Sequence, residues 1–273
     1  MASKVFAAID VGSNELSMKV YEITPKKGAR EIDYVNSTVE LGSDTYNSGR
    51  ITEDSIMKVC EILNKFRRKM REYDVREYKA YASSAVREAE NPSERRAVIA
   101  HCNCPDRAEY VKQRFMNYKA YAAKSKFEDA DTKNRALLDI GAGSLQISIF
   151  DKQNLIQTQN LPIGAVRIRD YLAKYGADTV ALENIMEEFV SNFIEEFRNL
   201  FINDKDIKSI IAIGDGIANL KKVGPELNIT DKITRDQFRV LYHKVVETTP
   251  EVLSEKYGVP YERATLMLPM AII

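Results

Sequence analysis

The stretch ALLDIGAGSLQISIF at residues 136–150 decides the fold. Its first three residues are apolar, Asp139 follows directly, and a glycine-rich turn occupies residues 141–144. From Leu145 onward, hydrophobic residues stand at every second position. An apolar run, a glycine-rich turn and a hydrophobic period of two together predict a β-hairpin.

The same arrangement stands near the N-terminus, in AAIDVGSNELSMKVYEI at residues 7–23. Here the apolar run leads to Asp10, the turn is Gly12-Ser13-Asn14, and alternation resumes at Leu16. A pattern that returns after so long a separation predicts two related α/β domains rather than a solenoid of short repeats. We place their boundary in the polar stretch that begins at residue 128, which gives domains 1–127 and 128–273.

Hydrophobic spacing predicts further strands and helices around these hairpins. Thr52 is a candidate N-cap for a helix whose apolar positions begin at Ile56. The other predicted elements are strands at Glu31–Leu41, Tyr78–Ala82 and Ser209–Ile213, and helices at Ser84–Glu90, Val111–Ser125, 179–201 and 235–256.

Composition limits the class of ligand. Lys plus Arg and Asp plus Glu balance at 40 each, so the formal net charge is zero. Because no global field attracts a polyanion, a phosphate ligand must be held by local geometry, and a non-specific nucleic-acid binder is disfavoured. No stretch approaches the roughly 20 apolar residues of a membrane span, no signal peptide is recognisable, and three cysteines suit a reducing compartment. We therefore expect a cytoplasmic protein that enters no membrane.

Three glycine-containing turns stand at predicted strand ends, at residues 10–14, 139–144 and 214–216. Glycine lets the backbone approach a ligand closely, and successive N–H groups in such a turn can bind phosphate oxygens. Asp10 and Asp139 could hold a hydrated Mg²⁺ or orient a water molecule there. The alternative is that each is an ordinary hairpin turn with a capping Asp. The recurrence in matched context favours the phosphate interpretation.

Six blocks of the sequence resemble, in order, the signature blocks of the Ppx/GppA family of exopolyphosphatases and guanosine pentaphosphate phosphohydrolases. They are AAIDVGSNELSMKVYEI, YASSAVREAEN, LLDIGAGSLQISIF, LPIGAVRI, IAIGDGIANL and ERATLMLPMAII. The resemblance implies the actin-like ATPase fold, which is ribonuclease H-like, with an active site in the cleft between two domains. It also implies Mg²⁺-dependent hydrolysis of terminal phosphoanhydrides in inorganic polyphosphate or pppGpp.

The turns and the resemblance together assign candidate site residues. Arg87, in the SAVREA block, matches an arginine of the family whose fork could grip phosphate oxygens. Candidate catalytic residues are Asp10, Arg87, Asp139 and Gln146, and the candidate metal ligands are Asp10 and Asp139. Candidate phosphate-binding residues are Gly12, Ser13, Asn14, Ser84, Gly141, Ala142, Gly143, Ser144, Gly214, Asp215 and Gly216.

The chain departs from the family pattern at its acids. Lys112 or Lys119, depending on the register, stands where the family has its catalytic glutamate, and Gln146 replaces a second acid. An amide cannot ionise to balance Mg²⁺. Three functions therefore stay open: a phosphohydrolase with weakened acids, a non-catalytic sensor of polyphosphate or a nucleotide, and a scaffold module.

The last seven residues, Met267–Ile273, are almost entirely apolar, whereas family members usually continue into a further helix. We expect this segment to dock against the core, to continue in a longer chain, or to be covered by a partner such as a second copy in a homodimer.

Overall fold

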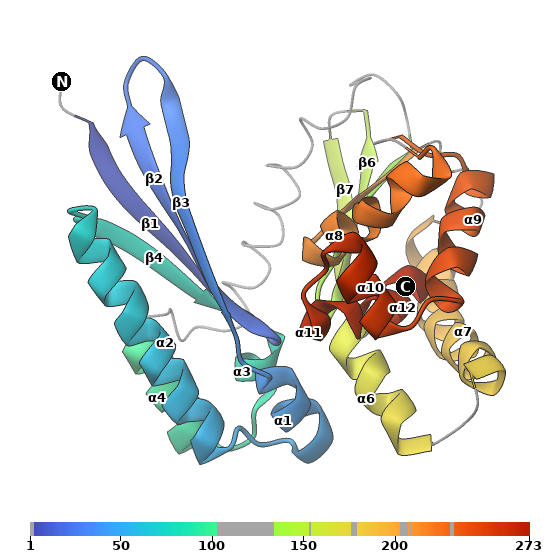
Figure 1. Ribbon diagram of the computed structural model, residues 1–273, viewed down its shortest axis with the longest axis horizontal. Helices are drawn as coiled ribbons and strands as arrows, with labels where there is room; N and C mark the ends of the chain where they lie inside the picture. The colour runs from blue at the N-terminus through green and yellow to red at the C-terminus, as the bar shows by residue number, and fades with distance from the viewer. Residues whose placement is uncertain are drawn as a thin grey trace. The chain divides into compact units, whose positions relative to one another are not determined.

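The computed structural model describes residues 3–102, 134–152, 154–175, 179–202, 207, 209–229 and 232–273. The chain divides into two compact units, Met1–Val111 (unit 1) and Lys112–Ile273 (unit 2), which are described separately (Figure 1). The domain boundary predicted after residue 127 lies outside the described residues. So do the predicted helix Val111–Ser125 and both lysines at the glutamate position.

Unit 1 contains a four-stranded sheet in the order β3-β2-β1-β4. The strands are β1 (Lys4–Val11), β2 (Glu15–Thr24), β3 (Gly28–Thr38) and β4 (Glu77–Ala82). The first three form antiparallel pairs, and β4 pairs with β1 in parallel. The third strand ends at Thr38 rather than at Leu41, because the N–H of Val39 bonds the Asn14 carbonyl at 3.1 Å and turns the chain out of the ladder.

Helices α2 (Glu53–Glu72) and α4 (Pro92–Cys102) pack together beside the sheet of unit 1 (Figure 1). As predicted, Thr52 is the N-cap of α2 and accepts a hydrogen bond from the N–H of Ser55 at 3.2 Å. Two short helices, α1 (Leu41–Ser48) and α3 (Ser84–Glu88), follow β3 and β4. The core joins alternate residues of β1 and β2 to the apolar side of α2, among them Ile9, Met18 and Phe66.

Unit 2 repeats the sheet of unit 1 in the order β7-β6-β5-β8, with β5 and β8 parallel. Its strands are β5 (Arg135–Ile140), β6 (Leu145–Asp151), β7 (Asn154–Leu161) and β8 (Ser209–Ile213). Even the irregularity is repeated: the extra residue of a bulge stands in β3 opposite the step after Val20, four residues beyond Leu16, and in β7 opposite the step after Ile149, four residues beyond Leu145. The two halves, predicted to be related, therefore have the same strand order and a bulge at the equivalent position.

The remaining elements of unit 2 are helical. They are α6 (Ala165–Tyr175), α7 (Thr179–Phe197), η2 (Arg198–Ile202), α8 (Asp215–Val223), η3 (Gly224–Leu227), α9 (Arg235–Val246), α10 (Pro250–Tyr257), α11 (Tyr261–Ala264) and α12 (Met267–Ile272). The single helix predicted at 235–256 is two helices, because Thr249 caps α10 and Pro250 cannot continue α9. Helix α12 packs against α6, α8 and α9, and Met267 and Met270 are buried.

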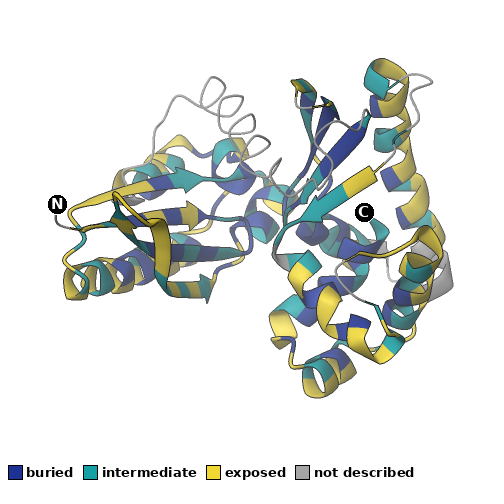
Figure 2. Cartoon of the chain, turned by 90° about the horizontal axis from the view of Figure 1, so that it is seen from above, coloured by how far each residue is buried: buried dark blue, intermediate teal, exposed yellow. Residues whose placement is uncertain are grey.

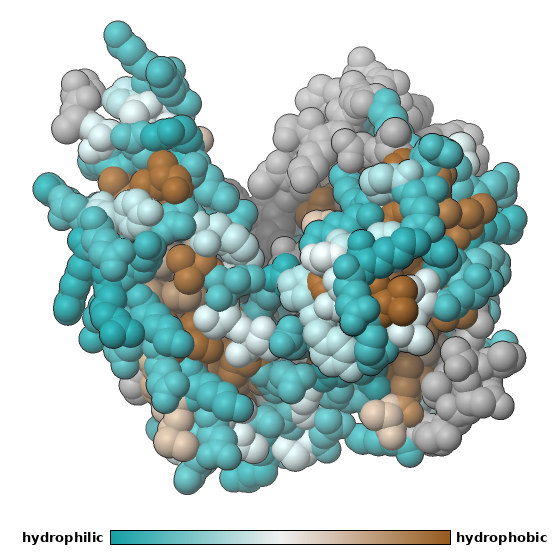
Figure 3. Space-filling model, in the orientation of Figure 1, coloured by the Kyte–Doolittle hydropathy of each residue, from teal (hydrophilic) through white to brown (hydrophobic). Residues whose placement is uncertain are grey.

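The strands of the two sheets differ in how many of their residues are buried (Figure 2). Strand β1 alternates, with Ala7, Ile9 and Val11 buried, whereas β6 is buried at six consecutive residues from Leu145 to Phe150. On the face seen in Figure 3, hydrophobic residues form separate small areas among hydrophilic ones. None of the helices in the described ranges has the length and apolar character needed to cross a bilayer.

The turn from β8 into α8 depends on Gly214, whose φ is +128°. A Cβ at this position would stand 2.3 Å from the carbonyl oxygen of Ile140, at the end of the neighbouring strand β5. The two parallel strand ends therefore approach each other as closely as they do only because residue 214 has no side chain.

We expect Gly214→Ala to destabilise the protein more than Gly28→Ala does. Gly28 also has a positive φ, +70°, but a Cβ there would have no atom within 4 Å, so only the left-handed backbone cost of about 1–2 kcal/mol applies. At Gly214 the steric conflict with Ile140 adds to that cost. Urea denaturation of both variants measures the difference, and equal losses would show that the strand ends separate easily.

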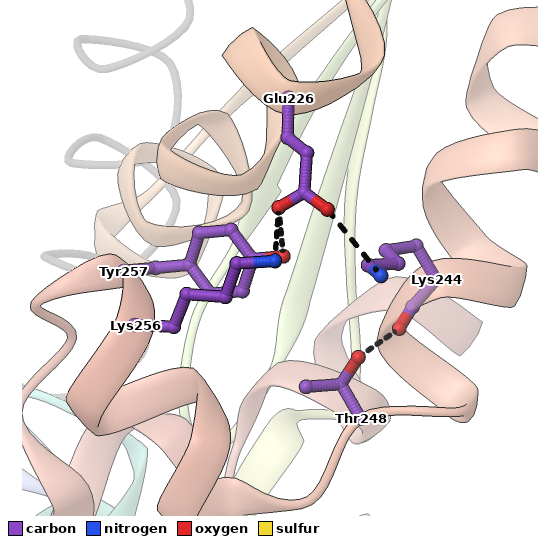
Figure 4. Close-up of polar contacts among 5 residues, drawn as sticks. All are labelled: Glu226, Lys244, Thr248, Lys256 and Tyr257. Carbon is purple, nitrogen blue, oxygen red and sulfur yellow. Dashed lines mark hydrogen bonds and ion pairs between the residues drawn. The ribbon is translucent and has the colours of Figure 1, made fainter.

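Glu226, in η3, joins two helices of unit 2 through its carboxylate (Figure 4). It accepts hydrogen bonds from Lys256 Nζ at 2.7 Å and from the Tyr257 hydroxyl at 2.5 Å, and Lys244 Nζ in α9 lies 3.5 Å away. The bonds from Lys256 and Tyr257, with the charges of both lysines, lower the pKa of Glu226 to about 2.

The stability contributed by Glu226 should depend on pH in a defined window. A carboxylate whose pKa is depressed by folding stabilises the protein above its unfolded pKa, 4.5, and loses that contribution as pH falls toward about 2. Glu226→Gln should therefore flatten the loss of stability over this window. Denaturation midpoints at a series of pH values test this, with Glu255→Gln, at an exposed position of α10, as the matched control. A slope unchanged by Glu226→Gln would contradict the assignment.

Candidate functional site

The hairpin turn of unit 1 is closed by one backbone hydrogen bond. The N–H of Gly12 donates to the carbonyl of Glu15 at 2.9 Å, and a Cβ at Gly12 would stand only 2.5 Å from the same oxygen. The ladder then places Asp10 of β1 opposite Ser17 of β2. Asp10 lies at an exposed position of its strand, between the buried Ile9 and Val11.

The hairpin turn of unit 2 has the same closure. The N–H of Gly141 donates to the carbonyl of Ser144 at 2.9 Å, and the ladder places Asp139 opposite Gln146. Asp139 therefore corresponds to Asp10, and Ala142 corresponds to Ser13. The two candidate carboxylates occupy the same position of two copies of one hairpin.

The start of α6 binds the carbonyl oxygens of Gly141, Ala142 and Gly143 in the second turn. The N–H groups of Ala165 and Val166 donate to the carbonyls of Gly141 and Ala142 at 3.2 and 2.8 Å, and Arg167 Nε donates to that of Gly143 at 2.6 Å. Gly164 makes this approach possible, because a Cβ there would stand 2.5 Å from the turn backbone.

This arrangement fixes where the N–H groups of the second turn point. In a planar trans peptide the N–H points opposite to the carbonyl of the preceding residue. The N–H groups of Ala142, Gly143 and Ser144 are therefore directed away from the groups that bind those carbonyls. Within the described ranges, no backbone hydrogen bond uses any of these three N–H groups. Successive backbone N–H groups that are free of such partners can bind an oxyanion.

The first turn is backed by α1 and carries hydroxyl groups. The N–H of Gly42 donates to the carbonyl of Ser13 at 2.6 Å. The Ser13 hydroxyl lies 2.8 Å from the Tyr46 hydroxyl, 3.1 Å from that of Ser83 and 3.3 Å from that of Ser84. The Tyr46 and Ser84 hydroxyls are 2.8 Å apart. The structure thus brings together two predicted residues, Ser13 and Ser84, with two that the sequence did not single out.

Arg87 and Gln146 make bonds within their own units. Arg87 Nη1 donates to the carbonyl of Ala82, at the end of β4, at 2.9 Å. Gln146 is buried, and its Nε2 donates to the Ser148 hydroxyl at 3.3 Å, which in turn bonds the Thr158 hydroxyl at 2.8 Å. The guanidinium of Arg87 is thus held beside the strand end that leads to Ser83 and Ser84.

Carboxylates are few around the two hairpin turns: Asp10 and Glu15 in the first hairpin and Asp139 in the second. Nowhere in the described part of the chain do three or more His, Cys, Asp or Glu side chains form a cluster that could hold a metal ion. One or two carboxylates fit Mg²⁺, which is usually held by that number together with waters and substrate phosphates. They do not fit an all-protein metal cage. In the third turn, Gly214 and Gly216 lie at the start of α8, where a Cβ on Gly216 would strike Met270 of α12.

Sequence reasoning missed Tyr46, Ser83, Gly164 and Arg167 as members of these turns. Gly164 and Arg167 stand inside the block LPIGAVRI, so the signal was present. Tyr46 gave no signal, because its position four residues after Gly42 becomes meaningful only when α1 is placed against the first turn.

Comparison with known proteins places the chain. The model of the Ppx/GppA phosphatase family matches residues 20–273. The bifunctional 3-dehydroquinate synthase/phosphatase of Fusobacterium nucleatum is 25% identical over 178 residues, which cover 60% of this chain and 26% of that protein. Exopolyphosphatase 1 of Mycobacterium tuberculosis is 26% identical over 167 residues, covering 60% of this chain and 48% of that protein. The chain thus spans between about a quarter and about half the length of these curated relatives.

Among solved structures, an exopolyphosphatase from Cytophaga hutchinsonii is similar with a TM-score of 0.80 at 18% identity, covering 98% of this chain and 88% of that one. Its likeness concerns the fold, and it agrees with the duplicated four-stranded sheet described above. The actin-like ATPase fold predicted from the sequence is confirmed. The chain belongs to the Ppx/GppA phosphatase family.

Proposed function

We propose that this protein is a phosphohydrolase that removes the terminal phosphate from inorganic polyphosphate or from pppGpp. The observation that carries the proposal is the second turn, where the N–H groups of Ala142, Gly143 and Ser144 all point away from α6. The family match and the exopolyphosphatases among the relatives support the same class of substrate. Because the net charge is zero, the ligand would be held by these local donors and not by a general positive field.

The proposed reaction is a displacement at the terminal phosphorus. A water oxygen forms a new bond to that phosphorus, the bridging P–O bond breaks, and the shortened chain leaves with the bridging oxygen while the water releases a proton. Outward N–H groups would stabilise charge on the phosphoryl oxygens. Asp10 and Asp139, one in each hairpin, are the candidate ligands for Mg²⁺, which would supply charge neutralisation when bound. We also propose that the protein acts in the cytoplasm, where its few cysteines, including the partly buried Cys60, would stay reduced.

A second function, a non-catalytic sensor that binds the same ligands, is favoured by Gln146. This residue faces Asp139 across the hairpin, where a second carboxylate would help to balance a metal, but it is an amide bonded to Ser148. A sensor would keep the donors of the turn and lose the reaction.

We expect phosphate release from medium-chain polyphosphate or pppGpp in the presence of Mg²⁺, and we expect Asp139→Asn to lower the rate about 100-fold or more. Loss of a group that positions the reacting water or its metal costs a factor in this range. The exposed Asp236→Asn in α9 is the matched control. A colorimetric assay of released phosphate measures both variants. Release that survives Asp139→Asn unchanged would remove this turn from the reaction.

Gln146→Glu separates the two functions. If the protein is a weakened phosphohydrolase, restoring the carboxylate opposite Asp139 should raise the rate of phosphate release about tenfold or more. If it is a sensor, calorimetry should show saturable binding of tripolyphosphate, and neither the natural chain nor Gln146→Glu should release phosphate. Absence of both binding and release would contradict both functions and leave a scaffold role.

A further inference from the structure

We propose that Tyr46 is a positioning residue for phosphate at the first turn: its hydroxyl holds those of Ser13 and Ser84 so that one of them can donate to a phosphoryl oxygen. This inference rests on the proposed function, because it assigns the first turn to the same phosphate ligand. It adds a residue from α1 that the phosphate-binding turns alone do not contain.

Tyr46 is the bridge between two segments that meet only in the folded unit. Its hydroxyl lies 2.8 Å from that of Ser13 in the hairpin turn and 2.8 Å from that of Ser84 at the start of α3. These are ordinary lengths for strong hydroxyl hydrogen bonds. The direct contact between the two serine hydroxyls is longer, 3.3 Å. Tyr46 therefore makes the two shorter contacts of the three.

The surroundings keep the phenol in this place. The N–H of Gly42 is bonded to the Ser13 carbonyl, and a Cβ on Gly42 would stand 2.8 Å from Cε2 of the Tyr46 ring. The ring thus lies against the bare backbone of Gly42. Ser13 and Ser84 are almost fully buried, at 4% and 3% exposure, so their hydroxyls have few other orientations.

The number of hydroxyl protons in this group decides how many can be donated to a ligand. Each hydroxyl donates one hydrogen bond and can accept two. Four hydroxyls meet here, those of Tyr46, Ser13, Ser84 and Ser83, and two of their four protons serve the two bonds of Tyr46. The other two serve the longer contacts of Ser13, 3.1 Å to Ser83 and 3.3 Å to Ser84, or can be donated to an anionic oxygen. An anionic acceptor makes the stronger bond. Without the phenol hydroxyl, each serine would instead bond to whatever neighbour its rotation reaches.

The duplicate in unit 2 shows that the fold does not need these hydroxyls. Ala142 corresponds to Ser13, since each follows the glycine that closes its turn. Ala82 in unit 1 and Gly214 in unit 2 hold equivalent positions, because the residue before each is paired with Asp10 or Asp139. Two positions further along the chain, Ser84 therefore corresponds to Gly216. The N–H of Val166 donates to the Ala142 carbonyl as the N–H of Gly42 donates to the Ser13 carbonyl, so these two donors correspond. Tyr46 and Asp170 each lie four residues after their donor and therefore correspond as well. The Asp170 carboxylate bonds Arg169 at 2.9 Å. The same turn closes there with no hydroxyl at any of the three positions, so a requirement of the hairpin does not explain the group in unit 1.

The test compares Tyr46→Phe with Tyr78→Phe, a matched loss of a phenol hydroxyl at an exposed position of β4. Phosphate release from polyphosphate gives kcat and KM, and calorimetry gives the dissociation constant of tripolyphosphate. We expect Tyr46→Phe to raise KM and the dissociation constant about three- to tenfold, the range of one neutral hydrogen bond. We expect kcat to stay within about twofold, since a group that positions bound phosphate acts on ground state and transition state alike.

A double-mutant cycle with Ser84→Ala shows whether Tyr46 acts through the serine. If it does, the double variant should bind tripolyphosphate no more weakly than the weaker single variant, whereas independent roles would give additive losses and overturn the proposal. Should Tyr46→Phe fail to fold, as judged by circular dichroism, Ser84→Ala alone decides, and natural affinity in that variant overturns the proposal.

The outcomes also distinguish this inference from the function on which it rests. If the natural chain binds tripolyphosphate and Tyr46→Phe binds it as tightly as Tyr78→Phe, the role of Tyr46 is overturned and the proposed function stands. If the natural chain neither binds tripolyphosphate nor releases phosphate, the proposed function is overturned and the role of Tyr46 with it.

Discussion

One backbone hydrogen bond, from a glycine N–H to the carbonyl three residues later, controls the geometry of both halves of this protein. It closes the hairpin at Gly12 and again at Gly141. Since side chains alternate along a strand, closing the turn at this residue decides which side chains share a face, and it sets Asp10 opposite Ser17 and Asp139 opposite Gln146. The strand order, the bulge and the approach of the following helix are all built on this register.

The hairpin turns of the two units share one backbone geometry but offer different hydrogen-bond donors. In unit 2 the carbonyls of the turn are bound by α6 and Arg167, so the turn offers backbone N–H groups. In unit 1 the turn is lined by the hydroxyls of Ser13, Ser84 and Tyr46. Backbone donors are fixed by the fold, whereas hydroxyl donors rotate and depend on their neighbours. The same scaffold therefore supports one rigid and one adjustable set of donors.

Periodicity was sufficient for the hairpins, because each has one buried face that repeats every second residue, and the N-cap at Thr52 is a purely local signal. Helix α1 could not be predicted in this way. Its sequence, LGSDTYNS, has little amphipathic character, and it is placed by the bond from Gly42 to a turn far back in the chain. The bond from Arg87 to Ala82 and the contacts of Tyr46 likewise depend on residues that are neighbours only in space. The carboxylates were found because they stand at the ends of predicted strands, whereas Tyr46 was missed because no local pattern marks it.

The parallel pairing of β4 with β1 has a consequence for the order of folding. Strands β1, β2 and β3 are joined by short turns, so their contacts are local and close quickly, whereas β4 joins only after α1 and α2 have been crossed. Ser13 and Ser84 are separated by 71 positions in the chain and come from these two different stages. The hydroxyl group at the first turn is therefore complete only when β4, which is distant in the sequence, has paired with β1.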